Sequence, residues 1–515
     1  MAPSIPETGS ETAEDGDEKF YSISCAVDLG TANPGISISS AGVVTWRDDS
    51  PDHPRNWTTA RKSYDIVVVG MLDFFTTVVS TTGPSAAALA RQEYQVGPMS
   101  ALIAFSLMYQ LGQAVGGLTV PPCSEAFGRR MLYILSAVVF ALFCLLIGIV
   151  PSLKMVYIGR FVTGFASAVP SVVLAGSVED LFNSRSRVWL VLLWNSLATA
   201  GLIFGPIFGV YISSCLGWRW VYYIAAVVTM VVTLLTLFIR ESRPSLLLAR
   251  KVATLNKQFG SELEFENHDR VADRTQLLNI ILIRTASLFV TEPIVILVTG
   301  ILAVPWAIIY LFTEALTGVY ETMGFSRTAS SLPFLAIGVG VLFSVFPRIQ
   351  DMRIARKRRL SGEQLEPEDK LVGFLFAVVS LAVGLWWFAW SIPPAVTEVP
   401  WIVPTIGLVF VGFPVNEMAY TLSSYLADSY TTFAASAFAA LVFVRAVISG
   451  VMPLIAYAMY NRISANLATT VVAVVATLFG IAPWILLRYS KTLRGLSPFA
   501  RYSLRVHEET RVEAD

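Results

Sequence analysis

Long apolar segments alternate with shorter polar ones along most of this chain of 515 residues. Each apolar segment holds about twenty residues, and a helix of that length crosses a hydrocarbon core about 30 Å thick. The pattern therefore predicts an all-α polytopic membrane protein with about twelve transmembrane helices. We expect the spans near residues 66–88, 100–120, 131–150, 155–178, 188–212, 219–239, 288–313, 328–346, 371–392, 399–421, 434–458 and 466–488.

A polar stretch near residues 240–285 separates the sixth expected span from the seventh. It divides the spans into two six-helix bundles, an arrangement typical of transporters built from paired repeats. The first residues are polar and rich in Ser, Thr, Gly and Pro, which indicates disorder. We expect a disordered cytoplasmic tail over 1–62, an N-terminal bundle over 63–239, a cytoplasmic linker over 240–285, a C-terminal bundle over 286–490 and a cytoplasmic tail over 491–515.

The basic residues predict the orientation of the chain in the membrane. Lysine and arginine are retained in the cytoplasmic loops of membrane proteins. If the N-terminus is cytoplasmic, most of the 37 Lys and Arg fall on the inner side, including the run from Arg353 to Arg359. The few on the outer side are Arg91, Lys154, Arg219, Arg327 and Arg462. This asymmetry indicates an even number of spans with both termini inside.

Composition agrees with a membrane protein and argues against an enzyme. Hydrophobic residues make up 55% of the chain and charged residues 14%, whereas soluble proteins carry about 25% charged residues. The four cysteines and three histidines are scattered without metal-binding or redox spacing. No phosphate-binding loop and no nucleophile with its partner residues is recognisable. We expect no enzyme activity, no metal, no cofactor and no nucleic-acid partner.

Glycines recur every four residues in the fifth expected span, at Gly201, Gly205 and Gly209. This spacing places them on one helical face, where they allow close approach of a neighbouring helix. Pro206 removes a backbone donor and bends the helix. The face is either a simple packing seam or a functional element, in which case we expect it to pack against a second-bundle helix near the outer gate.

Three acidic residues lie within or at the edge of expected spans: Asp73, Glu314 and Glu417. Burial in an apolar cavity favours the neutral form of a carboxyl group, as a proton carrier requires. All three histidines lie outside the spans, so a histidine relay is excluded. The three acids are candidates for proton coupling. The alternative is that each reaches interfacial water from a helix end.

Two arginines, Arg160 and Arg445, lie within expected spans, one in each bundle. Each could hold a carboxylate or face an anionic substrate. The competing interpretation is an ion pair that fixes helix packing.

The loop after the second expected span carries Glu125, Gly128, Arg129 and Arg130. Because this loop is expected to be cytoplasmic, its charges should latch the two bundles together in one state of an alternating-access cycle. The expected partners of the latch are Asp180, Arg185 and Arg187.

The substrate cavity of a paired-bundle transporter lies near the midplane, between the bundles. Aromatic side chains with a few hydrogen-bonding groups suit amphipathic organic molecules better than sugars. Alternatively, the Trp and Tyr residues belong to interfacial belts. The candidates are Tyr109, Gln110, Gln113, Asn195, Trp306, Tyr310, Asn416, Tyr420 and Arg445.

Three motifs together resemble those of the major facilitator superfamily. Residues Ser124–Arg130 resemble its cytoplasmic loop signature, Arg160–Gly164 its second motif and Gly201–Gly209 its antiporter motif. The set is similar to the twelve-span drug:proton antiporters. Further segments are similar to their fungal multidrug and polyamine branch: Pro54–Trp57, Trp218–Trp220, Glu241–Leu248, Tyr310–Glu314, Tyr425–Tyr430 and Ser436–Ala440.

The resemblance implies a proton-coupled exporter of small organic compounds, such as drugs, fungicides, toxins or secondary metabolites. The alternative is proton-coupled or facilitative uptake of a small nutrient. A receptor is disfavoured, because about seven spans and a ligand-sensing outer domain would be expected. We expect a monomer whose partners are its substrate, protons and the lipid bilayer. The expected location is the plasma membrane, with the vacuolar membrane as the alternative.

Overall fold

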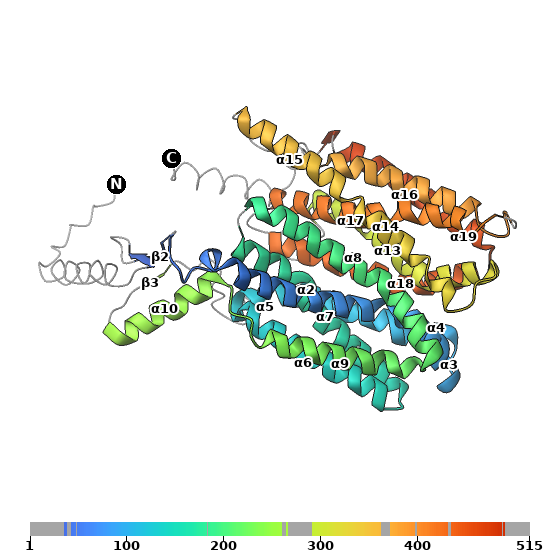
Figure 1. Ribbon diagram of the computed structural model, residues 1–515, viewed down its shortest axis with the longest axis horizontal. Coiled ribbons are helices and arrows are strands. Elements are labelled where there is room, and N and C mark those ends of the chain that lie inside the picture. The colour runs from blue at the N-terminus through green and yellow to red at the C-terminus, as the bar shows by residue number, and fades with distance from the viewer. Residues whose placement is uncertain are drawn as a thin grey trace, which may run out of the picture.

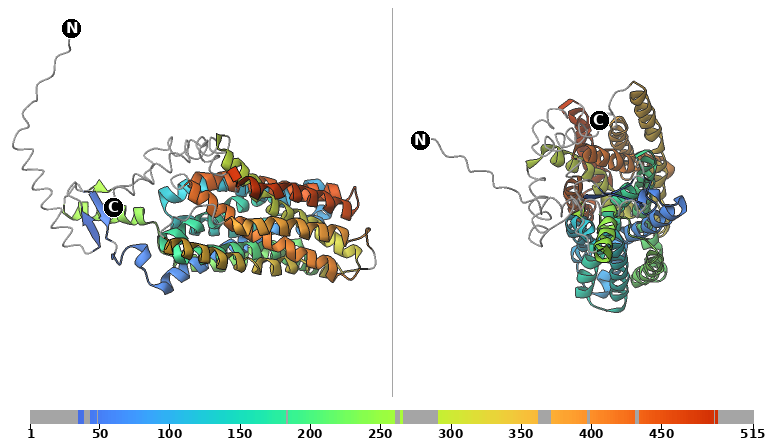
Figure 2. Two further views of the ribbon diagram at one scale, coloured as in Figure 1. Left: turned by 90° about the horizontal axis from the view of Figure 1, so that it is seen from above. Right: turned by 90° about the vertical axis from the view of Figure 1, so that its left-hand side faces the viewer.

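The computed structural model describes residues 35–38, 43–47, 49–182, 184–259, 264–265, 291–361, 371–396, 399–430, 434–486 and 488–489. Within these residues, 12 helices are long and apolar enough to cross a membrane, the number expected from the hydrophobic pattern. They run side by side along the long axis of the molecule (Figure 1, Figure 2).

The first bundle extends from α2 to α9. Its helices are α2 (Thr59–Thr81), α3 (Gly83–Glu93), α4 (Pro98–Leu102), α5 (Met108–Phe127), α6 (Arg129–Ile149), α7 (Leu153–Leu181), α8 (Ser184–Cys215) and α9 (Trp218–Thr236). One π-helical turn, Ile103–Leu107, joins α4 to α5, so that both belong to one span.

The second bundle extends from α13 to α19. Its helices are α13 (Pro293–Thr322), α14 (Phe334–Leu342), α15 (Val345–Leu360), α16 (Val372–Trp390), α17 (Ile402–Ser429), α18 (Ala434–Tyr460) and α19 (Ala465–Leu478). Helices α14 and α15 together form one span.

The two bundles meet along two seams, α5 against α18 and α8 against α14 and α17. Buried Leu202 and Ile203 of α8 belong to the same hydrophobic cluster as Phe334 and Ile337 of α14. Because apolar contacts of this kind lie between two separate bundles, the seams are the surfaces that must move in any rocking motion.

A small sheet lies beyond one end of the bundles, next to α10 (Pro244–Phe259) (Figure 1). Strand β1 (Ile36–Ile38) pairs antiparallel with β2 (Val43–Trp46), and β2 pairs parallel with β3 (Glu264–Phe265). Ile36 and Val44 pack on Leu248 and Val252 of α10. We call this side of the molecule the α10 end.

The strands fall within the disordered cytoplasmic tail expected over residues 1–62 and the cytoplasmic linker expected over 240–285, where we predicted no strand. None of the three strands has the length or the strong alternation that reveals a strand in sequence. The N-terminal strands and the segment after the first bundle stabilise each other instead. For example, the indole nitrogen of Trp46 donates to the carbonyl of Pro244 at 3.1 Å. Residues 1–34, 266–290 and 490–515 lie outside the described part of the chain.

Several expected spans have different boundaries in the structure. The first ends at Thr81 and not near residue 88, because Pro84 begins the separate helix α3, as proline favours a first helical turn. Helix α13 continues to Thr322, so Glu314 is within the helix and not in a loop. Helix α15 continues to Leu360, so Arg348 belongs to a span.

Candidate substrate and proton site

Asp73 lies in the middle of α2 with a side chain that is almost completely buried. The indole nitrogen of Trp194, on α8, donates to Asp73 Oδ2 at 2.7 Å. Among the described residues, Asp73 Oδ1 has no hydrogen-bond partner. A buried carboxylate satisfied on one oxygen only is costly to keep charged, which suits a group that gains and loses a proton.

Arg445 approaches this carboxylate from the second bundle. It is half-buried on α18, and its guanidinium lies 4.0 Å from the centre of the Trp306 ring of α13. It is close enough to Asp73 to interact with that carboxylate by charge, so opposite charges on the two bundles lie within electrostatic range of each other. The interpretation that Arg445 holds a carboxylate or faces an anionic substrate, and the alternative of an ion pair that fixes helix packing, both stay predictions.

Two hydrogen bonds join the bundles near Asp73. The hydroxyls of Ser80 on α2 and Tyr310 on α13 lie 2.8 Å apart. The amide nitrogen of Asn416, on α17, donates to the hydroxyl of Ser196 on α8 at 3.0 Å. The structure thus brings together four predicted residues, Asp73, Trp306, Tyr310 and Arg445, and places Asn416 at the neighbouring seam.

Several buried polar atoms along the seams have no hydrogen-bond partner among the described residues. They include Gln110 Nε2, Trp306 Nε1 and Asn416 Oδ1, in addition to Asp73 Oδ1. Buried polar groups normally have partners, so each of these needs an explanation. They come from α2, α5, α13 and α17, the helices along the two seams, where a polar ligand or water could supply the missing partners.

The other cavity candidates have different surroundings. Tyr109 is fully buried within the first bundle, where its hydroxyl donates to the carbonyl of Thr76 at 2.8 Å. Gln113 of α5 and Asn195 of α8 are half-buried. The ring of Tyr420 lies 3.8 Å below the guanidinium of Arg348, inside the second bundle. The structure therefore places Tyr420 beside Arg348, and it places Tyr109 against α2, about one helical turn from Asp73.

Glu417 belongs to a buried ion pair. Arg348 of α15 donates to Glu417, and both side chains are fully buried. Arg348 also pairs with Asp351 at 2.7 Å, and Thr421 donates to Glu417 at 3.0 Å. The alternative expectation of a helix-end acid that reaches water is wrong for Glu417, because its neighbours enclose it. Its role as a proton carrier remains a hypothesis that its ion pair makes less attractive.

Glu314 is half-buried on α13, two turns before the end of that helix. The basic group that acts on it by charge is Arg91 of α3, in the first bundle. Glu314 lies about one helical turn beyond Tyr310 on α13, and it remains a second candidate for proton coupling.

Arg160 has a packing role that neither sequence interpretation described. Its side chain is fully buried in α7 and donates to the carbonyls of Phe105 and Val79 at 2.7 and 3.2 Å. It also lies 4.4 Å from the centre of the Tyr109 ring. The guanidinium thus satisfies backbone acceptors in the π-helical turn Ile103–Leu107 and near the C-terminal end of α2. Nearby Gly164 lets α5 approach, since a methyl group there would overlap the carbonyl of Tyr109.

The loop motif forms a charge cluster at the α10 end. Arg129 Nε donates to Asp180 Oδ2 at 2.6 Å, so these two residues form an ion pair. The backbone nitrogens of Arg129 and Arg130 donate to the carboxylate of Glu241 at 3.0 and 3.2 Å, so that Glu241 caps α6. Gly128 has a φ of 91° and the Glu241 carboxylate beside it, which favours glycine there.

This cluster joins parts of the first bundle, contrary to the expectation of a latch between bundles. Asp180 lies on α7, and Glu241 directly follows α9. Arg187 pairs instead with Glu179 at 2.7 Å, and the side chain of Arg185 lies outside the described part of the structure. Glu125 is half-buried near the end of α5. The sequence motif identified the charged residues, but it did not indicate which helices their contacts connect.

The glycine face of α8 packs against α2, and not against the second bundle as expected. A methyl group at Gly201 would lie 2.9 Å from the carbonyl oxygen of Phe74, and one at Gly205 would lie 2.5 Å from that of Val78. Gly209 faces the end of α2 and the start of α3, since a methyl group there would meet Thr82 and the hydroxyl of Ser85. The opposite face of α8 contacts the second bundle. Pro206 is buried inside α8, between these glycines.

Sequence reasoning missed five contributors to these sites: Ser80, Trp194, Ser196, Glu241 and Arg348. Serine and tryptophan are common in membrane helices, so nothing in the sequence marked the first three. The spacing of Arg348 and Asp351, three residues apart on one helical face, was a usable signal for an intrahelical ion pair.

Comparison with known proteins agrees with this architecture. The family profile of the Major Facilitator Superfamily matches residues 68–453. The efflux pump radE of Floropilus chiversii is 27% identical over 492 residues, 94% of this chain and 90% of radE. The multidrug transporter FLU1 of Candida albicans is 28% identical over 458 residues, 88% of this chain and 75% of FLU1. The multidrug transporter TPO1_2 of Candida glabrata is 28% identical over 465 residues, 88% of this chain and 79% of that protein.

A solved structure shows the same fold. The xylose transporter XylE from E. coli, in a partially occluded inward-open conformation, superposes with a TM-score of 0.58 at 15% identity. The match covers 83% of this chain and 99% of XylE. The twelve spans, the fold and the family profile lead to one conclusion. This chain belongs to the major facilitator superfamily of membrane transporters, is related to fungal multidrug efflux transporters, and is not an enzyme.

Proposed function

We propose that this protein exports small amphipathic organic compounds in exchange for protons. The observation that carries the proposal is the half-satisfied carboxylate of Asp73, held by Trp194 and faced by Arg445 from the opposite bundle. An acid in this position changes the charge at the seam when it binds a proton. Such a change biases the contact between the bundles, as alternating access requires.

The surroundings of Asp73 support an organic substrate with apolar and polar parts. The Trp306 and Tyr310 side chains offer aromatic surface, and the unpartnered Gln110 and Asn416 atoms offer hydrogen bonds. Among the relatives, radE is described as an efflux pump, and FLU1 and TPO1_2 are described as multidrug transporters. Drugs, fungicides, toxins and secondary metabolites are the substrate classes that we propose.

The direct test uses the purified full-length protein in liposomes with an imposed pH gradient. Substrates are first chosen from a compound panel by the growth of a transporter-deficient host with and without this chain. We expect a chosen compound to move uphill toward the acidic side, opposite to the proton flow. Uphill movement together with protons would support nutrient uptake instead, and mere equilibration would indicate a facilitator.

We further propose that the α10 end is cytoplasmic, in the plasma membrane or alternatively the vacuolar membrane. The support is the positive-inside rule, since exposed Arg353, Arg356 and Lys357 lie at the end of α15. Arg327, also exposed, follows the opposite end of α13. A cysteine at Arg327 should react with a membrane-impermeant maleimide in intact cells, and a cysteine at Arg356 should not. The reverse labelling would contradict this orientation.

A further inference from the structure

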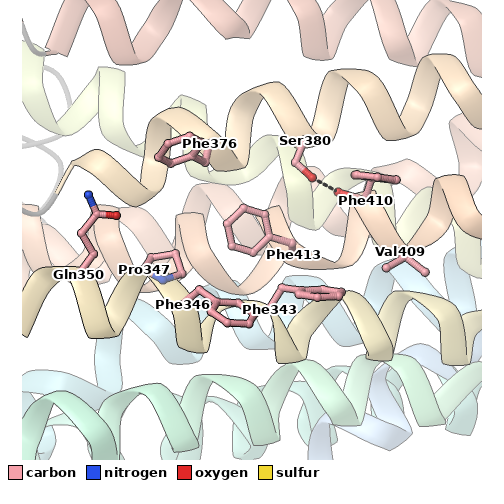
Figure 3. Close-up of a pocket in the computed structure, with 9 residues that line it drawn as sticks. All are labelled: Phe343, Phe346, Pro347, Gln350, Phe376, Ser380, Val409, Phe410 and Phe413. Carbon is pink, nitrogen blue, oxygen red and sulfur yellow. Dashed lines mark hydrogen bonds between the residues drawn. The ribbon is translucent and has the colours of Figure 1, made fainter.

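An aromatic groove of about 430 Å³ lies on the second bundle, between α15, α16 and α17 (Figure 3). Five phenylalanines line most of it: Phe343, Phe346, Phe376, Phe410 and Phe413. The Phe346 and Phe376 side chains are 65% and 62% exposed. In a helix bundle that crosses a membrane, such exposed apolar surface contacts lipid. The groove is therefore open to the hydrocarbon phase.

The groove has few polar groups, and they lie at defined places. Gln350 lies on α15 toward the α10 end of the groove (Figure 3). The hydroxyl of Ser380 is already used, since it donates to the carbonyl of Phe410 at 2.8 Å. A water-soluble ligand would find little hydrogen bonding there. A hydrocarbon chain with a polar group near Gln350 fits the distribution.

The groove-lining face of α15 continues into a basic surface. Phe346, Pro347 and Gln350 share this face, and the helical period adds Arg353 and Lys357 to it. Arg353 lies about 4.5 Å beyond Gln350 along the helix axis, and Lys357 about 10 Å beyond it. Both side chains are exposed. Figure 1 shows this end of α15 projecting beyond the neighbouring helices, where lipid headgroups are expected.

We propose that this groove and its basic end bind one anionic phospholipid. An acyl chain lies along the phenylalanines, Gln350 donates to the ester region, and Arg353 and Lys357 bind the phosphate and its anionic headgroup. Basic residues at a membrane surface attract anionic lipids, each contributing roughly fivefold in binding. The apolar part selects a lipid over a soluble anion, and the basic part selects an anionic lipid over a neutral one.

The test measures the lipids retained by the full-length protein. The protein is equilibrated in nanodiscs with equal amounts of phosphatidylserine and phosphatidylcholine, then released and analysed by native mass spectrometry. We expect the wild type to retain one phosphatidylserine preferentially. Arg353→Glu and Lys357→Glu should each reduce that preference several-fold. The matched control is Arg356→Glu, which makes the same charge change about a third of a turn away from the groove face.

A second variant tests the groove itself. Ser380→Phe fills the groove without changing any charge, and we expect it to reduce phosphatidylserine retention while the thermal unfolding midpoint without added lipid changes little. If Arg356→Glu lost as much of the phosphatidylserine preference, the preference would come from surface charge in general and not from this groove, and the proposal would be overturned. Equal retention of both lipids, or unchanged retention in Ser380→Phe, would also overturn it. Displacement of the lipid by a transported compound would make the groove a substrate path, and the proposal would be wrong.

Discussion

The hydroxyl of Ser80 on α2 and the hydroxyl of Tyr310 on α13 lie 2.8 Å apart, which places a hydrogen bond between the two bundles. Ser80 also donates to the carbonyl of Thr77 at 2.7 Å, within its own helix. Ser80 can therefore lose its bond to Tyr310 and still keep a hydrogen bond within its own helix.

Removing this bond should shift the balance between bundle arrangements. Tyr310→Phe and Ser80→Ala each delete one hydroxyl, and a hydrogen bond contributes about 0.5–1.5 kcal/mol. We expect a several-fold shift toward separated bundles, measured by electron–electron resonance distances between spin labels on α3 and α13. The double variant should shift no further than either single one, because both remove the same bond. Additive shifts would show that the two hydroxyls act independently.

Gly205→Val should destabilise the first bundle. The added side chain would meet the carbonyl oxygen of Val78 on α2, and overpacking of this kind costs about 1–3 kcal/mol or more. We expect a lower thermal unfolding midpoint, read from tryptophan fluorescence of the purified protein. The matched control is Gly300→Ala, whose new methyl group meets no atom within 4 Å. A stable Gly205→Val that leaks protons would instead support a gating role for this seam.

The Arg348–Glu417 pair should govern stability more than proton coupling. Removing one partner of a buried ion pair costs about 3–5 kcal/mol, whereas replacing both by apolar residues is often neutral. Because Arg348 also pairs with Asp351, the neutral replacement must remove all three charges. We therefore expect Arg348→Met, which leaves both carboxylates without their cation, to unfold at a much lower temperature than the triple variant Arg348→Met/Asp351→Asn/Glu417→Leu. The triple variant should still exchange protons for substrate, and loss of that exchange in a well-folded triple variant would restore Glu417 as the proton carrier.

Arg129→Lys should not replace arginine. Arg129 donates from Nε to Asp180 and from Nη1 to the carbonyl of Val173, at 2.6 and 3.1 Å. A lysine ammonium group cannot reproduce this fixed planar geometry. We expect a loss of about 1–3 kcal/mol of stability, measured by thermal unfolding. Arg130→Lys is the control, since Arg130 is exposed and makes one side-chain hydrogen bond, to Leu237. Equal effects in both variants would contradict the special role of Arg129.

The fold was largely predictable from sequence, because long apolar runs have few structural solutions in a membrane. The number of spans agrees with the structure. The first boundary was wrong because Pro84 begins a second helix inside a continuous apolar run. The sheet around Val44 was not predictable, since its short strands depend on α10 for their burial.

The site was only partly predictable. An acid within a span is rare enough to identify Asp73 directly, but its neighbour Trp194 is one of 12 tryptophans and has no distinguishing pattern. Helical periodicity placed Gly201 and Gly205 on one face, yet it contained no information on which helix that face meets. Tertiary packing decided that α2 is the neighbour.

The central claim is that Asp73 couples protons to substrate, and transport by Asp73→Asn in liposomes tests it most directly. The amide has nearly the same shape as the carboxyl group, but it does not bind or release a proton in the physiological pH range. We expect the variant to lose substrate movement driven by a pH gradient and to keep substrate exchange at equal pH, while Glu314→Gln keeps both. Normal gradient-driven transport by a folded Asp73→Asn protein would contradict the account.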